Sequence, residues 1–389
     1  MIMTRATRTL AVTGLLLIAI NLRPAVTSLG PVLEEVRASL GMSAAMAGLL
    51  TSVPTVCFAL MGSMAPLLAR RWGTGGSIGL GAAALTLGLA VRPFAGGTPL
   101  FLALTALALA GIAVANVLLP VVVKQRFPDH VGLVTGLYSV ALNLGAATAA
   151  AVTVPLTSSF GDDWRYGLAV WALLAVIAVP PWIALARYRD RGSAPVEDPG
   201  VPLRRQPLAW ALAVYFGLQA TAAYVVMGWL PQIFRDAGLS ASTAGLLFSL
   251  TSLLGVPLGF LLSALAGRLR RQSELAVGVA LFGVAGYAGL WAAPATAPWV
   301  WAVLIGIANC AFPLALTMIA LRGRSPAVVV RLSTFAQSTG YLLAVPGPIV
   351  VGALYEHTGT WRLPLALMIA LTVPQMIAGG LAGRSRHIG

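Results

Sequence analysis

The stretch Thr9–Val36 is apolar over most of its length and contains the sequence Asn21-Leu22-Arg23-Pro24 near its middle. Arg23 lies fifteen residues after Arg8 and eleven before Glu34. At about 1.5 Å per helical residue, its charge is roughly 16 to 22 Å from either end of the segment. An apolar segment of this length can cross a bilayer, so the sequence places a cation deep inside a membrane.

A cation at that depth is disfavoured by about 3 kcal/mol on insertion scales, and such residues normally face a protein interior or a wet cavity on a ligand or ion path. Arginine offers a planar, permanently charged group that matches carboxylate-like anions. We therefore expect Arg23 to bind substrate. The alternative is an internal tether, in which the guanidinium group donates to carbonyls at a kink produced by Pro24.

The composition indicates a polytopic helical membrane protein. Of 389 residues, 58% are hydrophobic and 9% are charged, and the mean hydropathy is +0.88. We predict an all-α membrane protein with twelve transmembrane helices. The predicted spans are 9–36, 44–69, 76–95, 99–123, 131–157, 164–187, 208–234, 242–267, 274–293, 297–321, 327–355 and 361–383.

The positive charges predict the orientation in the membrane. If both termini face the cytoplasm, nineteen of the 25 Lys and Arg residues lie on that side and five on the other, with Arg23 within the membrane. The positive-inside rule therefore predicts an N-in, C-in topology. This placement explains the net charge of +14 without a nucleic-acid partner. The apolar run after Arg8 is too long for a signal peptide and is predicted to be the first span.

One long polar stretch, Tyr188–Pro207, divides the spans into two groups of six. We predict an N-terminal six-helix bundle over 1–187, a cytoplasmic linker over 188–207 and a C-terminal six-helix bundle over 208–389. The two halves repeat each other. Ala47-Gly48-Leu49-Leu50 and Trp164-Arg165 recur 197 residues later as Ala244-Gly245-Leu246-Leu247 and Trp361-Arg362, and Asn116-x3-Pro120 is matched by Asn309-x3-Pro313. Parallel six-helix repeats are typical of transporters that hold substrate near the midplane between the halves.

Several motifs carry a resemblance to a known family: Asn21-Leu22-Arg23-Pro24, Gln219-x4-Tyr224-x4-Trp229-Leu230-Pro231, Phe312-Pro313-Leu314-Ala315-Leu316, Ala336-Gln337-Ser338 and Gly340-Tyr341-Leu342-Leu343-Ala344. The chain resembles the major facilitator superfamily over nearly its full length, and within it the cyanate/2-nitroimidazole transporter (CynX/NimT) branch. The resemblance implies two pseudo-symmetric six-helix bundles, a monomer, and a place in the cytoplasmic (inner) membrane of a prokaryote. It also implies a small-molecule substrate, either a small anion or a nitro-heterocycle.

The loop after the second span departs from the superfamily pattern Gly-x3-Asp-Arg-x-Gly-Arg-Arg/Lys. When the pattern is aligned on Arg71-Trp72-Gly73, the acidic position falls on Arg70. Arg70, Arg71 and Gly73 are therefore expected to form a cytoplasmic gating loop that lacks the Asp-centred charge pair.

All eleven carboxylates and all three histidines lie in predicted loops or at helix ends. The spans therefore lack the buried Asp, Glu or His that commonly relays protons in transporters. Cys57 and Cys310 lie in separate spans, so we expect no metal site and no cofactor. The sequence contains no HExxH, GxSxG or GxxxxGK[ST] motif, which argues against an enzyme and against ATP-driven transport.

Uncharged polar residues on the other spans are candidate substrate ligands. Ser333, Gln337 and Tyr341 follow one another at intervals of four residues on one helix face. The candidate substrate-binding residues are Arg23, Asn116, Tyr138, Asn143, Gln219, Tyr224, Asn309, Gln337 and Tyr341. The alternative for each polar group is a hydrogen bond to a neighbouring helix, worth about 0.6 kcal/mol. Asn116 and Asn309 are also suited to repairing carbonyls freed by Pro120 and Pro313.

The sequence thus favours a secondary active or facilitative transporter that moves a small, anionic solute by alternating access, with Arg23 as the substrate anchor. An efflux carrier for nitroimidazole-like or other drug-like compounds is the alternative. If transport is coupled to protons, the proton is expected to travel either with the substrate or through Glu34 or Glu274.

Overall fold

The computed structural model describes residues 5–187 and 202–388, and most of the predicted linker, residues 188–201, lies outside this part. The described chain is helical apart from one isolated bridge between Gly323 and Ile388. The helices are α1 (Arg5–Asn21), α2 (Pro24–Thr27), η1 (Gly30–Val32), α3 (Leu33–Leu40), α4 (Ala44–Val91), η2 (Arg92–Phe94), α5 (Thr98–Arg126), η3 (Pro128–His130), α6 (Val131–Ser159), α7 (Trp164–Ala186), η4 (Leu203–Arg205), α8 (Pro207–Asp236), α9 (Ala241–Arg268), α10 (Ser273–Ala292), α11 (Pro298–Asn309), α12 (Ala311–Arg322), α13 (Pro326–Ala344), α14 (Pro346–Thr358) and α15 (Arg362–Ala382).

Within residues 5–187 and 202–388, twelve helical segments are long and apolar enough to cross a membrane, which confirms the predicted fold class. Their limits differ from the prediction at the turn between the second and third spans. There α4 continues from Ala44 to Val91 and is interrupted only at Gly73, whose φ of 77° is outside the helical range. Positive φ at this point favours glycine, because a Cβ would clash with the backbone.

The chain forms two compact units. Unit 1 consists of Met1–Met42 and Leu60–Ala194, and unit 2 consists of Ser43–Ala59 and Pro195–Gly389. The first third of α4, residues 44–59, therefore belongs to unit 2 and the rest of the helix to unit 1. The two units reflect the proximity of Cα atoms, and the division between them falls within α4, between Ala59 and Leu60.

Three of the membrane-spanning segments are broken helices rather than continuous ones. The first is interrupted at Leu22 and Arg23, another at Cys310 between α11 and α12, and another at Val345 between α13 and α14. Proline lacks the N–H that would donate to the carbonyl four residues earlier. Pro24, Pro313 and Pro346 therefore account for the three breaks.

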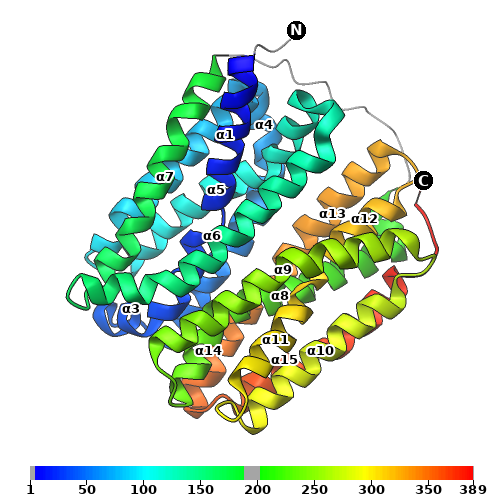
Figure 1. The fold of residues 1–389 in the computed structure, drawn as a ribbon. Coiled ribbons are helices and arrows are strands. Elements are labelled where there is room, and N and C mark those ends of the chain that lie inside the picture. Colours follow the sequence, from blue (N-terminus) through cyan, green and yellow to red (C-terminus); the bar gives the residue numbers. More distant parts are fainter. Residues whose placement is uncertain (1–4, 188–201, 389) are drawn as a thin grey trace. The chain divides into compact units, whose positions relative to one another are not determined.

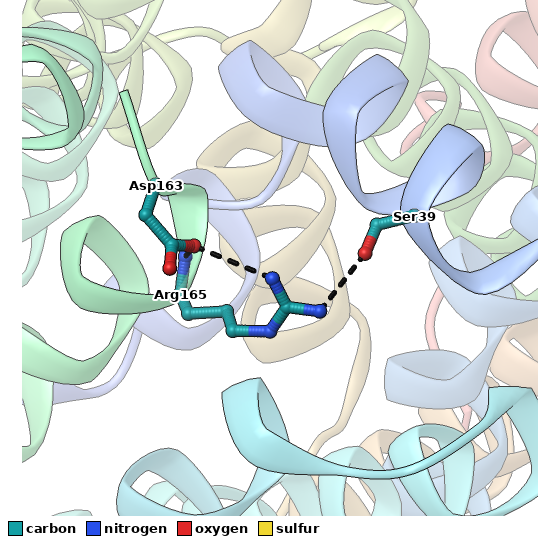
Figure 2. A network of polar contacts seen from close by, with 3 residues as sticks. All are labelled: Ser39, Asp163 and Arg165. Carbon is teal, nitrogen blue, oxygen red and sulfur yellow. Dashed lines mark hydrogen bonds and ion pairs between the residues drawn. The ribbon is translucent and has the colours of Figure 1, made fainter. Parts of the chain in front are cut away.

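In unit 1, α1 packs along α6 and α7 (Figure 1). The C-terminal part of α3 is attached to the start of α7 by a small polar network (Figure 2). Arg165 donates from Nη2 to Ser39 Oγ at 3.0 Å, and its Nη1 lies 3.5 Å from Asp163 Oδ1. The Asp163 carboxylate also caps α7 by accepting from the Arg165 backbone N–H at 3.0 Å. Asp163 thus caps the start of α7 and also holds the Arg165 side chain, which binds Ser39 of α3.

In unit 2, α8 packs along α13 and α15 (Figure 1). Its last residue, Asp236, accepts three hydrogen bonds: from Gln232 Nε2 at 2.7 Å, Tyr355 Oη at 2.6 Å and Trp361 Nε1 at 2.8 Å. The rings of Tyr355 and Trp361 are stacked with centroids 4.2 Å apart. This carboxylate therefore joins the ends of α8 and α14 to the start of α15.

The part of α4 in unit 2, residues 44–59, packs on α14 of the same unit through small residues. A Cβ at Gly48 would overlap the Pro348 carbonyl, and a Cβ at Gly352 would overlap the Ala44 carbonyl. Ser52 donates to the Val345 carbonyl at 2.8 Å, at the break between α13 and α14. Close backbone approach at small residues is the usual way in which membrane helices associate.

We predict that Gly88→Ala destabilises the protein. Gly88 of α4 faces α5, and an added Cβ would lie 2.6 Å from the Leu104 carbonyl oxygen and 2.7 Å from Ala108 Cβ. Overpacking of this kind costs on the order of 1–3 kcal/mol, so the melting temperature of the detergent-purified protein should fall. Gly278→Ala is the matched control, since no atom lies within 4 Å of the added Cβ. Equal melting temperatures for the two variants would contradict the tight α4–α5 contact.

Candidate functional site

Arg23 lies in the break between α1 and α2, where it is the residue before the first helical residue, Pro24. Its backbone carbonyl accepts from the N–H groups of Val26 and Thr27 at 2.9 and 3.0 Å and from Thr27 Oγ1 at 3.2 Å. The side chain is half-buried within unit 1. The backbone of this arginine is therefore held firmly by the turn that follows it, on a broken helix of the kind that forms transporter binding sites.

The opposite side of the break is closed by α6. Pro24 cannot donate to the Ile20 carbonyl, and this carbonyl lies against Gly145, where a Cβ would overlap the oxygen. Asn143 is two residues from Gly145, and its Nδ2 donates to the Ser139 carbonyl at 2.9 Å. Tyr138 lies on the same helix and is half-buried. Unit 1 therefore holds Arg23, Asn143 and Tyr138 on elements that pack against one another.

Two asparagines of unit 1 differ in environment. Asn21 is fully buried and donates from Nδ2 to the Leu17 and Leu174 carbonyls at 2.8 and 3.1 Å, so it joins α1 to α7. Asn116 of α5 is only half-buried and lies one turn before Pro120. Residues two apart on an ideal helix point in nearly opposite directions, so Asn21 is expected to face away from Arg23. Its hydrogen bonds to Leu17 and Leu174 agree with a packing role.

In unit 2, Tyr341 lies at a close contact between α8 and α13. A Cβ at Gly217 would be 2.9 Å from the Gly340 carbonyl oxygen, so these helices touch through their backbones. The Tyr341 ring is stacked on Phe58 with centroids 5.2 Å apart and meets Phe216 edge-on at 5.0 Å. An aromatic cluster of Phe58, Phe216 and Tyr341 thus lies beside this contact.

The remaining candidates of unit 2 are distributed over three helices. Gln337 of α13 donates from Nε2 to Ser333 Oγ at 2.6 Å, so the predicted polar face is joined by a side-chain hydrogen bond. Tyr224 of α8 is buried. Asn309 is the last residue of α11, at the break that precedes Pro313. The structure therefore does not bring Asn309 onto the α8–α13 contact, although it remains in the same unit.

Gln219 lies on a buried face of α8, with 4% of its surface exposed, and its Nε2 has no hydrogen-bond partner among the described residues. Tyr215, one turn earlier, packs on Gly379 of α15. Further along, Val226 and Met368 line the same small apolar cavity of about 10 Å³. These two pairings show that α8 and α15 run antiparallel, and they place Gln219 level with Gln375.

The predicted gating loop lies at the interruption of α4. Arg70 and Arg71 are exposed, and the Arg71 guanidinium lies 5.5 Å from the Trp72 ring centroid. Gly73 provides the non-helical backbone that turns the chain. In the described part of the chain, no group of three or more His, Cys, Asp or Glu side chains is arranged to hold a metal ion.

Residues 15–345 match the family model described as Major Facilitator Superfamily. The chain belongs to this superfamily. Its members are transporters, and the protein is therefore a multi-pass membrane transporter rather than an enzyme. It is similar to the uncharacterized transporter YycB of Bacillus subtilis (strain 168), with 37% identity over 97% of this chain and 94% of the relative.

Two relatives from Escherichia coli (strain K12) have names that state a substrate. The 2-nitroimidazole transporter is 34% identical over 98% of this chain and 97% of its own length. The cyanate transport protein CynX is 30% identical over 93% of this chain and 94% of its own length. This superfamily member is thus related to the CynX/NimT branch, as the sequence motifs indicate.

The fold also matches solved structures. A bacterial homologue of the human lysosomal transporter Spinster has a TM-score of 0.79 and 17% identity, and the match covers 98% of this chain and 97% of that structure. This likeness confirms the fold of the transporter.

Two residues that sequence reasoning missed are Arg92 and Ser52. The sequence places Arg92 at the end of the third span with the other arginines outside the membrane, yet it is fully buried. Ser52 lies within a predicted span, and it donates to the Val345 carbonyl at the α13–α14 break. Both residues contact segments far away in the chain, so only the packing of those segments reveals the contacts.

We predict that Gln219→Met leaves the melting temperature of the transporter unchanged or raises it. Burying an unsatisfied polar group costs about 1–3 kcal/mol, and replacing it with an apolar group of similar shape removes that cost. Gln272→Met is the matched control and should lower the melting temperature, because Gln272 Nε2 donates to the Ala266 and Leu269 carbonyls at 2.9 and 2.7 Å.

Transport kinetics of Gln219→Met separate the two roles of this amide. A raised KM supports substrate binding by Gln219, and an unchanged KM shows that its amide takes no part in substrate binding. A melting temperature that falls as far as that of Gln272→Met would show that the Gln219 amide is satisfied in the folded protein.

Proposed function

We propose that this transporter moves a small anion across the cytoplasmic membrane of a prokaryote by alternating access, and that Arg23 anchors the anion. The observation that carries the proposal is the place of Arg23 at the α1–α2 break, where the helix is interrupted within a membrane-spanning segment. A cation retained at such a place is expensive and therefore indicates a functional role. The two bundles, with both termini inside, are part of the same proposal.

The guanidinium group favours an anion over a neutral solute. A negatively charged substrate would form a charge-assisted and bidentate contact with it. The name of one relative, the cyanate transport protein, refers to a small anion and agrees with this choice. Neighbouring polar groups on α6, in particular Asn143, are suited to orient a small solute in unit 1.

A second candidate is an efflux carrier of nitro-heterocycles. One relative is named as a 2-nitroimidazole transporter, and the aromatic cluster of Phe58, Phe216 and Tyr341 in unit 2 offers flat rings on which a heterocycle could stack. The two candidate functions depend on different residues. Anion transport depends on the charge of Arg23, and heterocycle transport depends on the aromatic rings of Phe58, Phe216 and Tyr341 in unit 2.

We expect Arg23→Ala and Arg23→Lys to abolish anion transport in proteoliposomes. Alanine removes the charge, and lysine keeps the charge but loses the planar pair of donors that binds a carboxylate-like anion. The measurement is uptake of radiolabelled cyanate and small carboxylates, after a thermal-shift screen of wild type against these anions, amino acids and nitroimidazoles.

The variants must first be shown to fold, by an unchanged elution volume in size-exclusion chromatography and a melting temperature near that of wild type. Tyr341→Ala is the contrasting variant, because it disturbs the aromatic cluster and leaves the charge at Arg23. Full anion uptake by Arg23→Ala would remove the anchor role. Loss of nitroimidazole transport by Tyr341→Ala, with anion uptake absent even in wild type, would establish the second candidate.

A further inference from the structure

Arg92 is the most unusual charged residue in unit 1. It follows the last residue of α4 and is fully buried, with 0% of its surface exposed. Its Nη1 donates to the Ala25 carbonyl of α2 at 2.9 Å, and its Cζ lies 5.9 Å from the Phe101 ring centroid. Burying an ionised side chain is costly unless it is paired and hydrogen-bonded. Each nitrogen of this buried guanidinium group is therefore expected to have a hydrogen-bond partner.

Two of the three guanidinium nitrogens of Arg92 lack a hydrogen-bond partner among the described residues. Nε and Nη2 are buried and have no hydrogen-bond partner among the described residues. These nitrogens are on the same edge of the guanidinium plane. Their N–H groups are parallel, which is the geometry that binds the two oxygens of a carboxylate or a similar planar anion. The edge that could bind such an anion side-on is therefore the edge without a protein partner.

The surroundings supply a further polar group. Ser28 is three residues after Ala25 and lies on the same face of that short helical turn. It is fully buried, and its Oγ also has no partner among the described residues. Phe101, whose ring faces the Arg92 guanidinium group, is fully buried and meets the Trp164 ring edge-on at 6.1 Å. In apolar surroundings an ionic hydrogen bond is much stronger than in water.

A second buried arginine shows what a satisfied site looks like in this protein. Arg322 of α12 is 3% exposed, and it donates from Nε to the Ala382 carbonyl at 3.0 Å and from Nη2 to Gln272 Oε1. The same two nitrogens that lack partners in Arg92 are thus both paired in Arg322. Unpaired Nε and Nη2 groups are therefore not shared by both of these buried arginines.

We propose that the Nε–Nη2 edge of Arg92, together with Ser28 Oγ, binds a small planar oxyanion of the carboxylate or nitrate type. This site is built entirely from residues of unit 1 other than Arg23. The bound anion neutralises Arg92 and thereby stabilises the contact between Arg92 and α2. The inference does not depend on the transported substrate.

The test measures the melting temperature of the full-length, detergent-purified protein as sodium formate is added, with sodium isethionate keeping the ionic strength constant. Formate is small and planar, whereas isethionate is too bulky for a buried site. We expect formate to raise the melting temperature of wild type in a saturable manner, by several degrees. Arg23→Ala should keep a saturable formate response, which separates this site from the proposed transport site, and the Arg92 and Arg322 variants are compared in that background.

Arg92→Gln should lose the formate response, and Arg322→Gln should keep it. If Arg92→Gln does not fold, Arg92→Lys is used instead; it keeps the charge but lacks the paired N–H groups, and it should need at least tenfold more formate for the same shift. The proposal is overturned if wild type does not respond to formate, or if the Arg92 variant responds as wild type does. Loss of the response in Arg23→Ala alone would place the formate at Arg23 and also overturn it.

Discussion

The missing N–H of Pro24 is the constraint on which the first membrane-spanning segment depends. Because Pro24 cannot donate to the Ile20 carbonyl, the helix ends at Asn21 and a new turn begins after Arg23. An exposed carbonyl is costly in an apolar environment. Here it lies against the backbone of Gly145 on α6, and the break is thereby held at one place. Arg23 takes its position from this break, and the proposed anion site takes its position from Arg23.

The same device recurs in the second half of the chain. The break between α11 and α12 is at Cys310, three residues before Pro313, and the break between α13 and α14 is at Val345, directly before Pro346. At the latter break, Ser52 of α4 donates to the Val345 carbonyl, and glycines allow α4 and α14 to meet through their backbones. A membrane protein can keep broken helices only where neighbouring segments satisfy or cover the freed groups. The small residues of this chain therefore serve the breaks as well as the packing.

Charge is arranged by a different principle at the ends of the helices. Asp163 and Asp236 each bind several donors and join elements distant in sequence, Asp163 through Arg165 to α3 and Asp236 to Tyr355 and Trp361. Both acids lie at helix ends and have structural partners. Their positions agree with the sequence, in which carboxylates occur in loops and at helix ends. Arg92 differs from these acids, because two of its buried guanidinium nitrogens, Nε and Nη2, have no hydrogen-bond partner among the described residues.

Length, hydropathy and proline positions determined the twelve spans, since each span must be apolar to lie in lipid and each proline removes one hydrogen bond. The motifs determined the superfamily, and the charge of Arg23 singled it out in an apolar run. The tertiary structure alone decided which groups meet. It buried Arg92 against Ala25, assigned residues 44–59 of α4 to unit 2, and packed α8 against α15. These results depend on contacts between residues far apart in the chain, and an almost uniformly apolar sequence does not encode them in any local pattern.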